Sequence, residues 1–292
     1  MQAKLLLDCR NAHGEGVFWS AAHSLLYWTD IQGEKIWTFL PSSGESLSYR
    51  TPGRVCCFAT RENRAPTEIV AAFADGFAFL DLATGERAPI ADFEPDKPTT
   101  RLNDGRTDPS GRFIAGGMDE KDLAPISSVL RLDPDLTVTC LLEGVACANS
   151  TCFSPDGSTM YFADSPTRKI VAFAYDPATG TIGEKRTIAT IPEGDGVPDG
   201  SCVDSEGFLW NAVWEGYRVE RRAPDGRLDR TIEVPVKKPT CCAFGGDDLA
   251  TLYITTSRLA ETPADLAREP MAGGLFSVWT GIRGGIDMPF AG

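Results

Sequence analysis

Hydrophobic residues gather along the chain in short runs, and clusters of Gly, Pro, Asp and Asn separate these runs. The runs are rich in β-branched and aromatic residues, as in SLLYWTD, KIVAFAYD and TLYITT, and this composition is typical of strands. Residues 261–270 (ETPADLAREP) are different, because a threonine start signal, an acidic first turn and a closing proline predict one short helix there. The pattern therefore predicts an all-β fold of many short strands.

The strands repeat in a common register. Six segments each contain a strand that is followed, five residues after its first position, by a turn into a second strand. Their starts lie 40, 48, 46, 50 and 41 residues apart, which is the period of propeller blades. The first positions are Glu15, Val55, Asn103, Asn149, Asp199 and Thr240. We predict a single six-bladed β-propeller domain over residues 1–292, in which AKLLLD near the start completes the last blade beside GGLFSVW.

The six first positions suggest a chemical role. The first strand of each propeller blade lines the central channel, so these positions form a ring near one mouth. The ring holds two carboxylates and two carboxamides and no imidazole or thiolate, a donor set that suits hard divalent cations. Asn and Asp are ordinary turn formers. Four amide or carboxylate side chains at one convergent position would nevertheless leave unpaired polar groups and repelling carboxylates unless a cation compensated. We therefore predict a metal site at this mouth.

Composition excludes several classes of protein. The net charge is −13 and no basic run occurs, which argues against a nucleic-acid partner. No apolar stretch approaches the roughly 20 residues that span a bilayer, and the N-terminal run is too short for a signal peptide. The nine cysteines follow no disulfide or zinc spacing, so we interpret them as reduced, buried thiols, with redox sensing as the alternative. We expect a cytoplasmic protein with no membrane contact and no implied protein partner.

Other catalytic arrangements are poorly supported. A Ser–His–Asp site would need one of only two histidines, and no phosphate-binding loop stands between a strand and a helix. His13 lies two residues before Glu15 and could touch a substrate, although a plain loop role is the alternative. We expect four tryptophans to pack within blades rather than to form sugar platforms: Trp19, Trp28, Trp210 and Trp214.

Four stretches resemble the signatures of the gluconolactonase family, which includes regucalcin, also called senescence marker protein. They are HGEGVFW, RLNDGRTDPSGRFIAGGM, IPEGDGVPDGSCVDSEGFLW and CCAFGGDDLATLYITT, and they occur in the family's order over essentially the full chain. The resemblance implies a six-bladed propeller, one divalent metal in the channel mouth and hydrolysis of sugar lactones. It assigns Glu15, Asn149 and Asp199 as metal ligands, and Arg101 and Asn103 as substrate contacts.

The resemblance says less about Glu120. Family members commonly carry a glutamate in this loop that orients sugar hydroxyls, and we predict Glu120 as a further substrate contact. A solvated loop charge is the alternative, because Asp119, Glu120 and Lys121 adjoin.

The implied chemistry is metal-dependent opening of an aldonolactone to the sugar acid, in carbohydrate catabolism. The metal polarises the lactone carbonyl, and Asp199 is the candidate general base. A cation lowers the basicity of a carboxylate that it binds, so a metal-bound hydroxide remains an alternative nucleophile. We expect Ca²⁺, with Zn²⁺, Mn²⁺, Mg²⁺ or Fe²⁺ as alternatives. The alternative function is a non-catalytic Ca²⁺-binding or interaction propeller of regucalcin type, but Arg101 and Asn103 beside the ring favour an enzyme.

Overall fold

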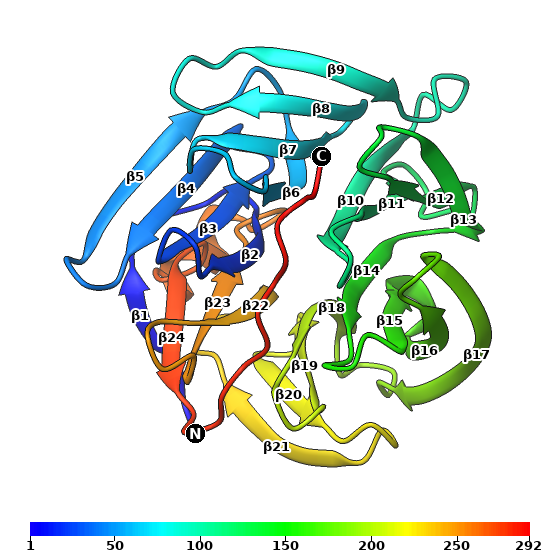
Figure 1. Cartoon of the computed structure of the whole chain (residues 1–292). Coiled ribbons are helices and arrows are strands. Elements are labelled where there is room, and N and C mark those ends of the chain that lie inside the picture. The colour runs from blue at the N-terminus through cyan, green and yellow to red at the C-terminus, as the bar shows by residue number, and fades with distance from the viewer.

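A computed structural model describes residues 1–292 and contains six four-stranded antiparallel sheets arranged as the blades of a β-propeller (Figure 1). Five blades are built in chain order from the channel outward. Blade 1 contains β2 (Gly14–Ser20), β3 (Leu25–Asp30), β4 (Lys35–Leu40) and β5 (Glu45–Arg50). Blade 2 contains β6 (Val55–Thr60), β7 (Glu68–Phe73), β8 (Gly76–Asp81) and β9 (Arg87–Asp92). Blade 3 contains β10 (Thr100–Thr107), β11 (Phe113–Asp119), β12 (Ser127–Leu132) and β13 (Val138–Val145).

The remaining blades follow the same plan. Blade 4 contains β14 (Ala148–Phe153), β15 (Thr159–Asp164), β16 (Lys169–Asp176) and β17 (Thr181–Thr190), with the short 3₁₀ helix η1 (Ser165–Thr167) between two of its strands. Blade 5 contains β18 (Val197–Val203), β19 (Leu209–Trp214), β20 (Arg218–Arg222) and β21 (Leu228–Glu233). Blade 6 contains β22 (Pro239–Gly245), β23 (Thr251–Thr256), β24 (Leu275–Trp279) and, as its outer strand, β1 (Lys4–Leu7). The predicted six-bladed fold is confirmed.

The N-terminal strand closes the ring. β1 pairs antiparallel with β24, with Lys4 opposite Ser277 and Leu5 opposite Phe276. This pairing confirms the predicted closure of the last blade, and it supplies β24 with a hydrogen-bonded partner instead of an exposed edge.

Apolar side chains fill the spaces between neighbouring blades. Trp210 of blade 5 meets Phe244 of blade 6 edge to face, with ring centroids 5.3 Å apart. Trp19 and Trp28 are also buried, as predicted. Both members of each adjacent cysteine pair are buried, because an inner strand is covered on both faces, and all nine cysteines are free.

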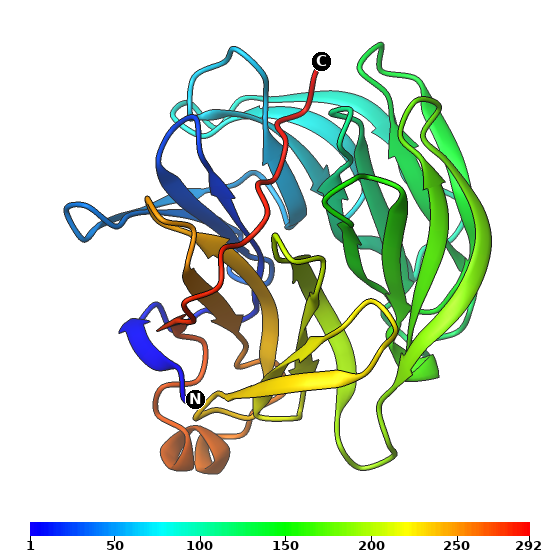
Figure 2. The ribbon, with the colours of Figure 1, turned by 60° about the horizontal axis from the view of Figure 1, so that its bottom comes forward.

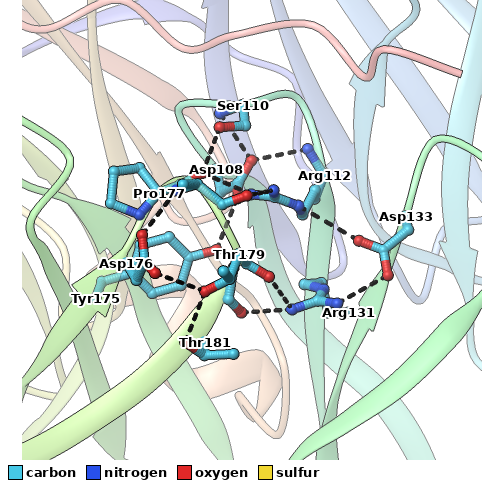
Figure 3. A network of polar contacts seen from close by, with 12 residues as sticks. Asp108, Ser110, Arg112, Arg131, Asp133, Tyr175, Asp176, Pro177, Thr179 and Thr181 are labelled. Carbon is cyan, nitrogen blue, oxygen red and sulfur yellow. Dashed lines mark hydrogen bonds and ion pairs between the residues drawn. The ribbon is translucent and has the colours of Figure 1, made fainter.

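Polar contacts also join the blades at their edges. Between blades 3 and 4, the buried carboxylate of Asp108 accepts hydrogen bonds from Tyr175 at 2.6 Å and from Arg112 at 2.7 Å (Figure 3). Arg131 donates to the carbonyl oxygens of Thr179 and Gly180 in the turn between β16 and β17. These contacts fix the position of one blade relative to the next.

The predicted helix exists as α1 (Pro263–Arg268), which begins with a capping box between Thr262 and Asp265. No helix in the structure is long and apolar enough to cross a membrane. Figure 2 shows α1 on the side of the ring away from the C-terminus.

Residues 280–292, which we call the C-terminal strap, cross one mouth of the channel (Figures 1 and 2). The backbone of Phe290 bonds to Thr60 at the end of β6, and Thr107 at the end of β10 donates to the carbonyl oxygen of Met288. The strap therefore covers the mouth where the inner strands end. The first positions of the repeat lie at the other mouth, where these strands begin.

Candidate active site

A break in sheet register occurs at the start of every inner strand. In all six blades the pairing between the inner strand and its neighbour shifts at the repeat's first position or directly after it. The residues that follow Glu15 and Asn149 have left-handed backbones, with φ of 58° at Gly16 and 62° at Ser150. Such bulges redirect a side chain away from the regular pleat. They let these side chains meet in the channel mouth.

A cavity of about 270 Å³ opens at this mouth. Five of the six predicted site residues line it: Glu15, Arg101, Asn103, Asn149 and Asp199. The other two first positions have different surroundings, since Val55 is apolar and buried, and the Thr240 hydroxyl donates to the Gly14 carbonyl oxygen.

Glu15 and Asp199 are buried acids with exposed fractions of only 6% and 5%. Burial, and then the Asp104 carboxylate, raise the pKa of Glu15 to about 8. Burial, followed by Glu15 and Asp104, raises the pKa of Asp199 well above its usual range. The arginines nearby, Arg101 and Arg106, form ion pairs with other acids. The mouth thus holds a cluster of acids with no cation of the chain bound to Glu15 or Asp199.

The amides complete a set of oxygen donors. Asn149 donates from Nδ2 to Ser165 Oγ at 2.8 Å, while its Oδ1 has only a long contact of 3.4 Å with Asn103 Nδ2. Asn103 is held differently, because its Oδ1 accepts from Arg101 Nη1 at 2.7 Å and its Nδ2 donates to the Ala148 carbonyl oxygen at 2.9 Å. Asn149 therefore has an oxygen free to coordinate, whereas the oxygen of Asn103 is bonded to Arg101. That Asn103 contacts substrate stays a prediction.

Arg101 lines the cavity and has one nitrogen without a partner in the chain. Its Nε binds Glu120 Oε1 at 2.7 Å, and its Nη1 donates to the Leu102 carbonyl oxygen at 2.8 Å as well as to Asn103. Nη2 makes no hydrogen bond within the chain. A side chain fixed at two of its three nitrogens loses little conformational entropy when the third binds a ligand.

Glu120 does not line the cavity. Its two oxygens accept hydrogen bonds from Arg54 at 2.8 and 3.0 Å, and one of them also binds Arg101. The structure places Glu120 behind Arg101, where it orients the guanidinium group. That it contacts substrate stays a prediction.

The cavity contains residues to which the sequence interpretation gave no firm role. Trp214 was expected to pack within a blade, but it lines the cavity. Trp214 lies opposite Val197 in the β18–β19 hairpin, and Val197 is two residues before Asp199. The hairpin register therefore places Trp214 at the same mouth as Asp199. His13 also lines the cavity, and burial, with smaller effects of Arg101 and Lys238, lowers its pKa to about 3.

Comparisons with known proteins identify the family of this chain. Residues 13–258 match the family described as SMP-30/Gluconolactonase/LRE-like region. The chain is 41% identical over 294 residues to L-arabinolactonase of Azospirillum brasilense, covering 100% of this chain and 96% of that protein. It is 35% identical over 290 residues to regucalcin of Danio rerio, covering 97% and 96%. The crystal structure of regucalcin, a calcium-binding protein of Agrobacterium tumefaciens, superposes with a TM-score of 0.92 at 29% identity, covering 99% and 97%. The resemblance seen in the sequence is therefore confirmed, and the chain belongs to the SMP-30/gluconolactonase/LRE-like family.

Proposed function

We propose that this protein is a metal-dependent sugar lactonase, a carboxylic-ester hydrolase that opens an aldonolactone to its sugar acid in carbohydrate catabolism. One observation carries the proposal: the buried acids Glu15 and Asp199 line the same cavity as Arg101, whose Nη2 makes no hydrogen bond within the chain. The acids suit a cation, and the guanidinium suits the oxygens of a small ester. The relative named L-arabinolactonase, at 41% identity over the full chain, supports a sugar lactone as substrate.

The donor set fits a divalent cation. Glu15, Asp199 and the Oδ1 of Asn149 would hold it, and all are hard oxygen ligands of the kind that Ca²⁺ and Mg²⁺ prefer. Burial, and after it repulsion from neighbouring acids, raise the pKa of both carboxyls, and a bound cation would relieve that repulsion. When bound, the ion supplies Lewis-acid polarisation of the lactone carbonyl. We infer Ca²⁺ from the calcium-binding regucalcin relative, with Zn²⁺, Mn²⁺, Mg²⁺ and Fe²⁺ as alternatives.

The protein's own residues have separate tasks. Arg101 donates from Nη2 to the lactone oxygen on which negative charge develops, and Asn103 and Glu120 hold it in position. Asp199 accepts a proton from the attacking water as the water oxygen bonds to the carbonyl carbon. The ring C–O bond then breaks, and Asp199 returns the proton to the departing ring oxygen, which becomes the hydroxyl of the product. Burial raises the pKa of Asp199 and so makes its carboxylate a stronger base, whereas a bound cation would lower that pKa. The product is a hydroxy acid that ionises and releases a proton.

Proton release provides the test. Metal-stripped protein is mixed with five- and six-membered aldonolactones and a pH indicator, each divalent ion is added back in turn, and spontaneous hydrolysis is subtracted. We expect metal-dependent acid release on a few sugars, and its loss in Asp199→Asn. If no lactone releases acid although calorimetry shows that the protein binds the metal, the proposal is contradicted. That result would favour the alternative, a non-catalytic calcium-binding propeller, which the regucalcin relatives support.

A further inference from the structure

One wall of the cavity is built by blades other than the one that supplies Arg101. His13 precedes β2 of blade 1, Trp214 ends β19 of blade 5, and Leu259 follows β23 of blade 6. Arg101 belongs to blade 3, which lies opposite blade 6 in a ring of six. A ligand in the cavity therefore has a charged donor on one side and an aromatic wall on the other.

His13 is fixed in this wall. Its backbone N–H donates to Asp30 Oδ1 at 2.8 Å, and its ring Nδ1 lies 2.9 Å from Ser257 Oγ. Ser257 is in turn held by the Ala12 carbonyl oxygen and by the backbone N–H of Leu259. The other ring nitrogen, Nε2, makes no hydrogen bond within the chain. Since the side chain lines the cavity, Nε2 is the atom of His13 left for a ligand.

Trp214 is fixed from two sides. The His13 ring meets it edge to face, with centroids 5.7 Å apart. The Lys238 ammonium lies 5.1 Å from the centroid of the Trp214 ring. Lys238 also pairs with Glu261 at 2.6 Å and donates to the Leu259 carbonyl oxygen at 2.7 Å. These buried contacts hold the indole and the loop that carries Leu259 in one arrangement, so the wall is formed before any ligand binds.

We propose that His13 and Trp214 form the subsite that recognises the hydroxylated sugar ring of the lactone. His13 Nε2 exchanges a hydrogen bond with a ring hydroxyl, and the indole packs against the apolar C–H groups of the ring. A sugar ring carries both hydroxyl groups and patches of C–H groups, so it can use both contacts. An unsubstituted lactone has no ring hydroxyls and cannot bond to His13 in this way. This inference rests on the proposed lactonase function for its substrate, and it assigns the selectivity for sugars to these two residues.

Steady-state kinetics of His13 variants test the proposal. His13→Phe keeps an aromatic ring beside Trp214 and removes Nε2, so KM for the best aldonolactone should rise about 3- to 10-fold while kcat changes less. His13→Gln places a carboxamide near the position of Nε2 and should recover part of the loss. His23→Phe is the matched control, because His23 lies outside the cavity in the turn after β2, beside Ser20, and should leave KM unchanged.

Two further measurements separate the possible outcomes. The affinity for the metal ion, measured by calorimetry, should be the same in His13→Phe and wild type. A joint loss of metal and substrate affinity would indicate that His13 has a structural role and would overturn the proposed subsite.

Binding of 1,4-anhydropentitols and 1,5-anhydrohexitols, followed by NMR, tests recognition without hydrolysis. These cyclic polyols carry ring hydroxyls but no ester, so they should bind wild type more tightly than His13→Phe even if no lactone is opened. Equal binding to the two proteins, or none to wild type, would overturn the subsite independently of the lactonase assay.

Discussion

Ser150 Oγ donates a hydrogen bond of 2.5 Å to the backbone carbonyl oxygen of Asp199. Ser150 directly follows Asn149 on β14, and Asp199 lies on β18 of the next blade. Asn211 Nδ2 reinforces the contact by donating to the same carbonyl oxygen at 2.9 Å and to Ser150 Oγ at 3.0 Å. Two proposed metal ligands from neighbouring blades are thus fixed relative to each other by buried hydrogen bonds.

Two replacements of Ser150 should separate the effect of this hydrogen bond on metal affinity from the effect of the left-handed backbone on stability. Ser150→Ala loses the hydroxyl, and we expect the Kd for the metal ion to rise about 5- to 10-fold. Ser150→Gly should lose a similar affinity. It should nevertheless be about 1 kcal/mol more stable than the alanine variant, because glycine adopts the φ of 62° without a Cβ clash. Calorimetric titration with Ca²⁺ and urea unfolding in chelator check the two effects, and equal stabilities would refute the argument from φ.

The stability of the metal-free protein should fall as pH rises. Burial and neighbouring acids raise the folded-state pKa of Glu15 to about 8 and shift that of Asp199 in the same direction. Between the unfolded pKa of about 4.5 and pH 8, the folded state therefore binds more protons than the unfolded state. The free energy of unfolding in chelator should decrease from pH 5.5 to pH 8, by up to about 1.4 kcal/mol per pH unit for each proton.

Saturating metal should cancel this fall in stability. The ion competes with protons for Glu15 and Asp199, so the stabilisation that it gives should increase with pH over the same range. Denaturant titrations at pH 5.5, 7 and 8.5, with and without Ca²⁺, measure both slopes. A metal-free stability that rises with pH would contradict the raised pKa of Glu15.

Arg101 and Arg54 offer a matched pair of variants. Both bind Glu120, but only Arg101 lines the cavity. We expect Arg101→Met to lower kcat/KM about 100-fold, in the range found when an oxyanion donor is removed, and Arg54→Met to cost about tenfold or less. Equal losses in the two variants would mean that Arg101 acts only through the loop that carries Glu120.

Local repetition explains how much of this site could be predicted. The inner strands recur at a nearly constant spacing, and this alone placed Glu15, Asn149 and Asp199 at one mouth. Trp214 escaped the prediction because its position depends on hairpin register, which a blade period does not encode. The ion pair of Glu120 with Arg54 joins residues 66 positions apart on blades 2 and 3, and no local pattern indicates such a contact.

The C-terminal strap supplies the last prediction. Asp287 of the strap binds Arg106 at 2.7 Å, and Arg106 is buried in the channel below the site, where it also donates to the Ser201 carbonyl oxygen. Asp287→Ala leaves that guanidinium unpaired, so we expect a loss of about 2–4 kcal/mol in the free energy of unfolding. Asp287→Asn keeps a hydrogen-bond acceptor and should lose less. Asp75→Ala breaks the ion pair of Asp75 with Arg87 on the surface and should cost only about 0–1 kcal/mol. Urea unfolding of the three variants ranks them, and a loss in Asp287→Ala no larger than in Asp75→Ala would show that the strap does not secure the charge in the channel.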